Sequence, residues 1–219
     1  MTTRLAGELV LRTPTIDDGH EIRNLMRSTV VLGRPAVGVD IDDYLDTCLQ
    51  WYLTEGLNDC AVCRIDGAFR GYALVGLDPL SAERSHRRAA LRLSARVLRR
   101  SLLGQIDPLT RRFYLLRLRD AVGLTADSRL RLAVPHAHMN ITASARSGSV
   151  ALALRNHIDQ KVTQAGFDRW LGEVNARSGS RANALERLGF SVIGTRKNHT
   201  LSALAGSPVE RLTVERCLR

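Results

Sequence analysis

The chain has 219 residues, 44% of them hydrophobic, which is enough to bury one large core and excludes a disordered or small disulfide-stapled fold. No apolar run approaches the roughly 20 residues that span a bilayer, and the N-terminus lacks the features of a signal peptide. The net charge of +10 suggests a nucleic-acid partner. However, all of the 32 basic residues except Lys161 and Lys197 are arginine, and a GC-rich genome produces this bias without selection for binding. We expect a soluble, cytosolic protein of one domain (1–219), with neither a membrane nor a nucleic-acid partner.

The first 77 residues predict a strand, two helices and a β-hairpin, in that order. The hairpin turn falls at Asp66-Gly67, a dipeptide that tolerates the positive φ values of a tight turn. The expected ranges are 8–12 for the strand, about 15–29 and 40–52 for the helices, and 59–65 and 69–77 for the hairpin strands.

The four cysteines predict neither a disulfide framework nor a metal site. Cys60 and Cys63 have C-x-x-C spacing, but they lie in an apolar stretch that is typical of a strand, and no second Cys or Cys/His pair follows at ligand spacing. We therefore expect both side chains in the core, and no metal.

Residues 80–122 interrupt the alternation of strands and helices. They are predicted to be helical, with Leu91, Ala95, Leu98 and Leu102 apolar and arginines largely around the other faces. Between Ser81 and Arg119, eleven arginines stand against two acidic residues. Two interpretations remain open: a solvated helical face, or a lid or docking surface for an acidic acceptor, a carrier protein or RNA.

The second half alternates strands and helices. The expected strands are 132–142, 168–174, 190–198 and 209–217, and the expected helices are 150–165 and 179–188. This order predicts an α/β fold, with a mixed sheet, helices on both faces and an antiparallel C-terminal pair.

The element order and three local motifs resemble the GCN5-related N-acetyltransferases (GNAT). The first motif is Arg146-Ser147-Gly148-Ser149-Val150-Ala151, similar to the family's Gln/Arg-x-x-Gly-x-Gly/Ala turn, although Ser149 and Ala151 stand where the family usually has glycine. The second is Ala184-Leu185-Glu186-Arg187-Leu188-Gly189-Phe190, similar to Leu-Tyr-Glu-Lys-Leu-Gly-Phe. The third is Leu171-Gly172-Glu173-Val174 followed by Ser178, which resembles a strand and a downstream Asn of N-terminal peptide and ribosomal-protein acetyltransferases.

The resemblance is strongest over 132–200, and it implies a GNAT-like sheet with splayed central strands and a helical insertion between the third and fourth strands. It also implies a site for acetyl-CoA or another acyl-CoA. Pantetheine contacts are expected from Met139, Asn140 and Ile141, and pyrophosphate contacts from Arg146, Ser147, Gly148, Ser149, Val150 and Ala151, where backbone N–H groups at a helix start favour an anion. Ser178 is expected to reach the pantetheine or the phosphate arm.

Acyl transfer to an amine needs a base and a proton for the leaving thiolate. Glu173 matches the family's glutamate position and is the predicted base, with a pKa raised by partial burial. His136, His138 and Asn140 alternate onto one strand face, and His138 is the predicted participant in proton movement or acceptor binding. Leu185 occupies the position of the family's tyrosine, so either Ser178, His138 or water protonates the thiolate, or no acid is needed because a thiolate leaves readily near neutral pH.

Three functions remain open at this stage. The leading one is an N-acetyltransferase that acts without a metal, as a monomer or homodimer, on a primary amine of a small molecule or polypeptide; unusual donors and RNA- or carrier-bound substrates are variants of it. The second is a CoA-binding or regulatory module without turnover, which Ser149 and Leu185 favour. The third, a nucleic-acid binder, lacks the interleaved aromatic residues that bind single strands.

Overall fold

A computed structural model describes residues 7–122, 133–145, 148–177, 179 and 182–218. Seven strands form one sheet in the order β1-β2-β3-β4-β5-β7-β6. The pair β4–β5 is parallel and the other pairs are antiparallel, so the sheet is mixed, as predicted. The strands are β1 (Leu9–Arg12), β2 (Ala61–Ile65), β3 (Ala68–Gly76), β4 (His136–Ile141), β5 (Arg169–Arg177), β6 (Ser191–Lys197) and β7 (Val209–Cys217).

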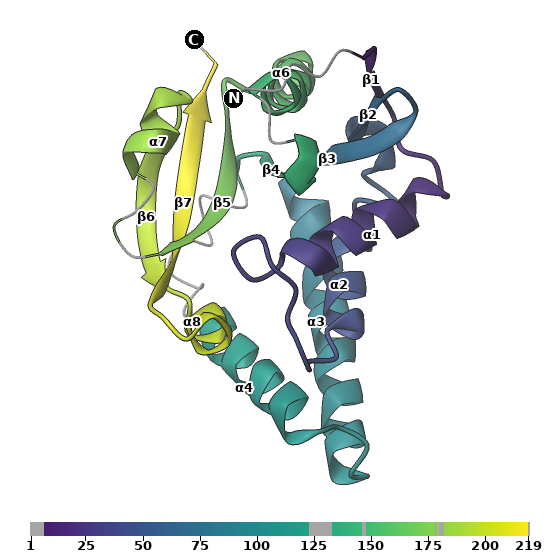
Figure 1. The fold of residues 1–219 in the computed structure, drawn as a ribbon, viewed down its shortest axis with the longest axis vertical. Helices are drawn as coiled ribbons and strands as arrows, with labels where there is room; N and C mark the ends of the chain where they lie inside the picture. Colours follow the sequence, from purple (N-terminus) through teal and green to yellow (C-terminus); the bar gives the residue numbers. More distant parts are fainter. Residues whose placement is uncertain (1–6, 123–132, 146–147, 178, 180–181, 219) are drawn as a thin grey trace.

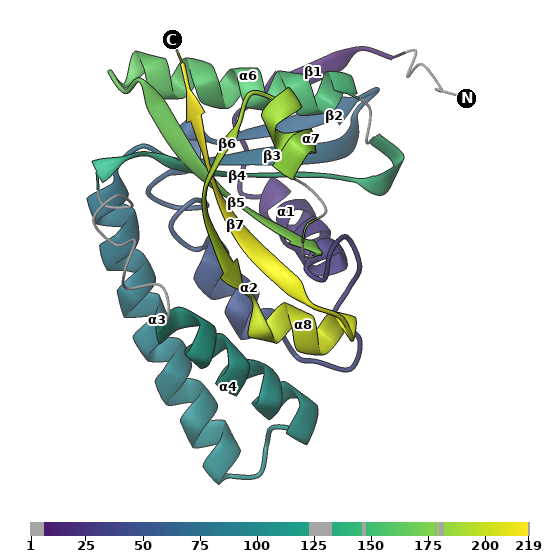
Figure 2. The same ribbon diagram turned by 90° about the vertical axis from the view of Figure 1, so that its left-hand side faces the viewer.

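Helices cover both faces of this sheet (Figures 1 and 2). Helices α6 and α7 lie on one face, and α1, α2 and α8 lie on the other, while α3 and α4 extend beyond α2 and α8 as an open hairpin. In the part of the chain that the structure describes, no helix is long and apolar enough to cross a membrane. The helices are α1 (Asp18–Thr29), α2 (Asp42–Leu49), α3 (Pro79–Leu102), α4 (Pro108–Val122), α6 (Gly148–Gln164), α7 (Ala182–Arg187) and α8 (His199–Ala205).

The predicted elements are all present, with small shifts at their ends. Among the described residues β4 begins at His136, and β5 continues three residues beyond the predicted end at 174. Helix α8 was not predicted. Its start signal was nevertheless in the sequence, because the Asn198 side chain accepts a hydrogen bond from the Leu201 N–H, and Gly206, at φ 64°, ends the helix.

Two local predictions about the first hairpin are confirmed. Asp66 and Gly67 both have positive φ, 51° and 76°, as a tight two-residue turn requires. Cys60 and Cys63 are free thiols with no exposed surface, and they belong to the cores on opposite faces of the sheet. The C-x-x-C pair therefore packs the interior on both sides of β2.

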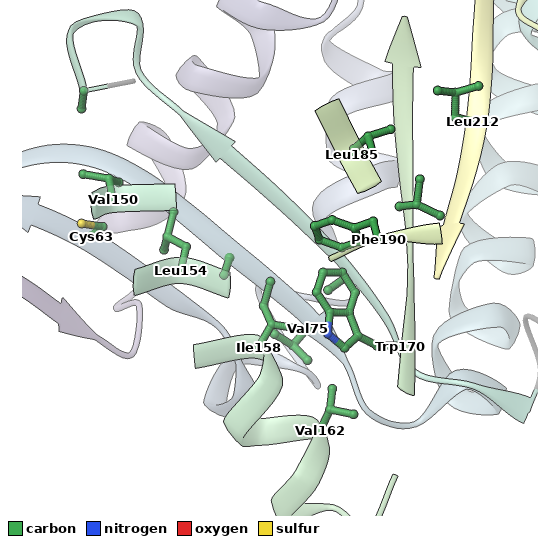
Figure 3. Close-up of a cluster of buried hydrophobic side chains, with 14 of the residues drawn as sticks. Cys63, Val75, Val150, Leu154, Ile158, Val162, Trp170, Leu185, Phe190 and Leu212 are labelled. Carbon is green, nitrogen blue, oxygen red and sulfur yellow. The ribbon is translucent and has the colours of Figure 1, made fainter. Parts of the chain in front are cut away.

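Helix α6 packs against the sheet through one continuous apolar stripe. Val150, Leu154, Ile158 and Val162 are spaced by four residues and are fully buried. Figure 3 shows this row reaching from the neighbourhood of Cys63 to that of Trp170, so α6 contacts strands in both halves of the sheet. At about 1.5–3 kcal/mol for each buried side chain, the stripe fixes the helix firmly against the sheet.

The insertion turns a different face inward from the one its leucines suggest. The predicted apolar residues Leu91, Leu98 and Leu102 are 72%, 61% and 79% exposed. Ala82 and Ala89 are buried instead, and Ala82 belongs to the core around Tyr52 and Trp51. Leu93 and Val97 are partly buried and pack against the core cluster that contains Leu45 and Phe113. The inward face of α3 thus runs along Ala82, Ala89, Leu93 and Val97, at helical spacing, and the other leucines point to solvent.

Candidate active site

The central strands separate after two residues of pairing. β4 stays paired with β3 along its length and β5 with β7, but β4 and β5 pair only at His136–Leu171 and Ala137–Gly172. The Leu171 N–H donates to the Pro135 carbonyl at 2.8 Å, and alternation along each strand then turns the amides of Met139 and Glu173 toward the gap. Backbone groups on both edges of the gap are thus available to an extended ligand.

The three residues predicted to contact pantetheine have different surroundings. Met139 is 38% exposed and lies on the α6 side of β4, between Ala137 and Ile141, which pack into the core. The Asn140 side chain points to the other side and donates to Thr29 Oγ1 at 2.6 Å, so it fastens the end of α1 to β4. Met139 therefore has the most suitable position of the three.

The start of α6 lies beside this gap and has room for a ligand. A Cβ placed on Gly148 would meet no atom within 4 Å, and Gly148 and Ser149 are both exposed. Val150 is fully buried and anchors the first turn, and Ala151 is half-buried. The first N–H groups of a helix have no partner within it and favour an anion. Arg146, Ser147 and Ser178 lie outside the described residues.

Glu173, the predicted base, lies on the face of β5 opposite α6. Its carboxylate is 23% exposed and forms an ion pair with Arg211 Nη1 at 3.7 Å. A neighbouring guanidinium favours the charged carboxylate, which is the form that accepts a proton. Glu173 shares this face with His138, because alternation places both side chains away from the α6 core.

His136 and His138 pack against a buried tyrosine. Their rings lie 5.7 and 5.8 Å from the Tyr52 ring and 6.0 Å from each other. The Tyr52 hydroxyl is buried without a hydrogen-bond partner among the described residues, and burial raises its pKa well above the usual value. A Cβ on Gly76 would approach the His136 ring to 2.7 Å, so glycine is needed there.

Leu185, at the position of the family's tyrosine, is part of the core. It is 8% exposed and belongs to the same apolar cluster as Phe190 and Trp170, on the α6 face. A side chain in this environment supplies no proton to a leaving group. That Ser178, which lies outside the described residues, His138 or water does so instead stays a prediction.

A polar cluster that the sequence analysis missed surrounds Glu173. Burial raises the pKa values of Tyr44 and Cys48 and lowers that of His86, yet each of these side chains keeps partial exposure. The charge of Glu173 contributes to the shifts of Cys48 and His86, so these groups lie near it. We define the polar cluster as Tyr44, Cys48, His86, Arg117, Glu173 and Arg211.

A pocket of about 580 Å³ opens on the same face of β5, beside this cluster. Asn175, two residues and about 7 Å along the strand from Glu173, forms part of its wall. We call it the β5 pocket; its described lining is Val31, Leu32, Arg34, Pro35, Ala36, Val37, Asn175, Ala176, Arg177, Leu204 and Ala205. Another pocket, of about 370 Å³, lies between the end of α6 and β7, away from the gap.

One wall of the β5 pocket is a strained loop. Val31 and Arg34 exchange backbone hydrogen bonds of 2.8 and 3.0 Å around Leu32 and Gly33, which both have positive φ. Leu32, at φ 53°, adopts a conformation that is unfavourable for a residue with a branched side chain. Such outliers concentrate at binding sites, because the surrounding structure must hold them.

No protein-family model matches the sequence, and a search of curated proteins finds no relative by sequence. Solved structures do match over nearly the whole chain. A polyamine N-acetyltransferase of Drosophila melanogaster that forms N-acetylagmatine has a TM-score of 0.59 at 16% identity, over 96% of this chain and 100% of its own. The structure of yncA from Salmonella typhimurium with its cofactor acetyl-CoA has 0.54 at 13%, over 96% and 94%. A ribosomal-protein-alanine N-acetyltransferase from Brucella melitensis has 0.53 at 16%, over 95% and 99%.

At these identities the similarity shows the fold alone. Together with the splayed central strands, it establishes that the protein has the GCN5-related N-acetyltransferase fold that the sequence motifs predicted.

Proposed function

We propose that the protein is an acyl-CoA-dependent N-acyltransferase, most simply an acetyltransferase, that acts on a primary amine. The observation that carries the proposal is the divergence of β4 and β5 after Ala137 and Gly172, beside an open start of α6. The anionic end of an acyl-CoA donor suits the start of α6, and its extended arm suits the unpaired edges of β4 and β5. The fold and the neighbours' printed activities support the same class.

The chain's own residues would hold the donor in three places. Backbone N–H groups from Gly148 onward favour its phosphates, the Met139 amide pairs with its amide-rich arm, and the gap directs its reactive end toward Glu173. When bound, the donor supplies a thioester whose acyl group passes to the amine.

On the face of the sheet opposite α6, Glu173 takes a proton from the ammonium group of the acceptor. The neutral nitrogen then forms the new C–N bond as the C–S bond of the donor breaks. The nitrogen then gives up its second proton, which passes through His138 or water to the leaving thiolate. Glu173 is partly exposed on this face and its carboxylate is positioned by the ion pair with Arg211. The β5 pocket accommodates the body of the acceptor.

A binding module without turnover is the second candidate. It is favoured by Leu185, a buried core residue where the family has an acidic hydroxyl, and by Ser149 in the phosphate turn. This candidate retains CoA binding but predicts no acyl transfer with any amine.

The first experiment is a thermal melt with acetyl-CoA. A ligand that binds only the folded state at a hundredfold excess over Kd stabilises it by about 2.7 kcal/mol, which raises Tm by several degrees. Gly148→Glu should abolish the shift by placing a carboxylate where the phosphates bind. Thr163→Glu, at the exposed far end of the same helix, should keep it. An unchanged wild-type Tm in millimolar acetyl-CoA would contradict the proposal.

A further inference from the structure

Arg117 is an inward-facing cation of the insertion with no carboxylate partner among the described residues. Other arginines of the insertion that face α2 are neutralised, because Arg96 pairs with Asp43 and Arg100 pairs with both Asp40 and Asp43. Arg117 instead donates to the Tyr44 hydroxyl, and its guanidinium stacks over the Tyr44 ring at 4.4 Å. These contacts hold the guanidinium in place without neutralising it.

The carboxylates nearest to Arg117 are already used. Asp120 accepts hydrogen bonds from the backbone N–H groups of His199 and Thr200, both at 3.0 Å, and from Thr200 Oγ1 at 2.6 Å, so it caps α8. Glu173 pairs with Arg211. Burial acts to lower the pKa of Arg117, but the acidic groups around it raise that pKa overall, so it stays charged.

Within the polar cluster, two guanidinium groups therefore share one carboxylate. A half-buried cation needs a counter-charge, because desolvation is costly for an ion that is not paired. The donor phosphates do not provide it, since α6 and α4 lie on opposite sides of the sheet. The described lining of the β5 pocket contains the basic residues Arg34 and Arg177 and no acidic residue. Arg117 thus lies on the acceptor side with no carboxylate within ion-pair distance among the described residues, although Asp120 and Glu173 act on it from farther away.

We propose that the acceptor amine carries a carboxylate, which Arg117 binds while Glu173 receives the proton of the amine. The inference rests on the proposed function and names its substrate class: amino acids or short peptides with a free amine, rather than polyamines. The planar guanidinium of Arg117, held by Tyr44 and without a direct carboxylate partner among the described residues, offers parallel N–H groups to a carboxylate. Tyr44 acts as a positioning residue, because it fixes the plane of that guanidinium.

The test uses acceptors in matched pairs that differ in one carboxylate. Each amino acid is compared with its carboxamide, and arginine with agmatine, in steady-state assays with acetyl-CoA. The wild-type protein should favour the acid of the preferred pair by about tenfold or more in kcat/KM, because a cation built to bind a carboxylate loses its partner with the amide.

Three variants locate the effect. Arg117→Gln should raise the KM of the acid about tenfold or more, and leave the KM values of the amide and of acetyl-CoA unchanged. Arg119→Gln, an exposed residue on the same helix, is the matched control and should behave as wild type. Arg34→Gln tests the pocket. A preference lost in Arg34→Gln but kept in Arg117→Gln overturns the assignment to Arg117, and a wild-type preference for amides overturns the substrate class.

A second measurement remains decisive if no amine in the panel is acetylated. Phenylglyoxal modifies accessible arginines, and mass spectrometry reports the extent at each site. Millimolar amino acids should protect Arg117, their carboxamides should not, and Arg119 should react equally in both. Equal modification of Arg117 under all conditions overturns the inference. Failure of acetyl-CoA to shift Tm, with Arg117 still protected, would instead reject the proposed function and leave the carboxylate site standing.

Discussion

The two faces of the sheet have interiors of different character. On the α6 face, the buried cluster from Cys63 to Val214 is apolar throughout. The buried polar side chains of the described residues all belong to the other side: Asp18, Thr110, Asn198, Thr200 and Thr213. The polar cluster around Glu173 lies on that side too. The apolar face fixes the geometry of the gap, and the polar face places charge beside it.

This difference has a physical consequence for stability. Burial of apolar surface does not depend on the protonation of any group, whereas a buried ion pair contributes only while its acid is charged. Changes on the two faces should therefore respond differently to pH.

The largest loss of stability is expected from Asp18→Asn. Asp18 is 1% exposed, and its carboxylate accepts hydrogen bonds from Arg12 at 2.6 and 2.8 Å and from Arg64 at 2.8 Å. Removing the charge leaves Arg12 without its carboxylate and Arg64 with Glu21 alone, which should cost about 3–5 kcal/mol in urea unfolding at pH 7. A loss below about 1 kcal/mol would mean that water solvates the arginine side chains as well as the Asp18 carboxylate does.

The pH dependence of this effect has a definite sign. Burial acts to raise the pKa of Asp18, but hydrogen bonds from Arg12, Thr15 and Arg64 outweigh it and hold the pKa well below the usual range. The folded state therefore binds the proton more weakly, and the contribution of Asp18 is full above about pH 4 and is lost as the pH falls further. The difference between wild type and Asp18→Asn should shrink in unfolding curves measured from pH 5 to pH 3.

On the apolar face, Leu154→Ala should cost about 3 kcal/mol. Leu154 is fully buried in the middle of the α6 stripe, and its truncation leaves a cavity that the packed core cannot fill. The same urea series should show an equal loss at pH 5 and pH 7, because no titrating group is removed. A marked pH dependence would show that the two faces are coupled.

Much of the apolar face could be predicted from the sequence, and little of the polar one. Regular spacing marked the strands and α6, and a local motif marked the helix start at Gly148. The polar cluster draws on α2, α3, α4, β5 and β7, so no local pattern predicts it. Cys48 fitted an apolar stripe of its helix, and His86 lies in an arginine-rich segment whose inward face is set by the alanines beside it. Only the tertiary arrangement brings these groups to Glu173.

On the polar face, Glu173→Gln should lower acyl transfer about a hundredfold and leave the acetyl-CoA shift in Tm unchanged, as expected for the loss of a general base. The deficit should shrink at high pH, where more of the amine is already neutral. Glu215→Gln is the matched control, because Glu215 is a half-buried carboxylate on the same face that pairs with Arg169. Equal turnover of Glu173→Gln and wild type at every pH would transfer the role of base to His138 or remove it.

The smallest effect is expected on the outer face of α3, where the leucines and arginines point to solvent. Arg92 and Arg99 are exposed and form no ion pair among the described residues, so reversing both to Glu should change stability by less than about 0.5 kcal/mol. Arg96 pairs with Asp43, so it belongs to the fold and is left unchanged. If the acceptor is small and is bound by Arg117, its KM should change less than about twofold in the double variant. Added salt should change the KM of the double variant and of the wild type to the same extent.

The contrary outcome is an acceptor KM that rises in the double variant and rises with added salt in the wild type. It would mean that the outer face binds a larger, acidic acceptor, because salt screens interactions between exposed charges, with a Debye length of about 8 Å at physiological ionic strength. The substrate would then be an amino group on a carrier protein or RNA, with Arg117 binding its nearest anionic group and the outer arginines holding the rest.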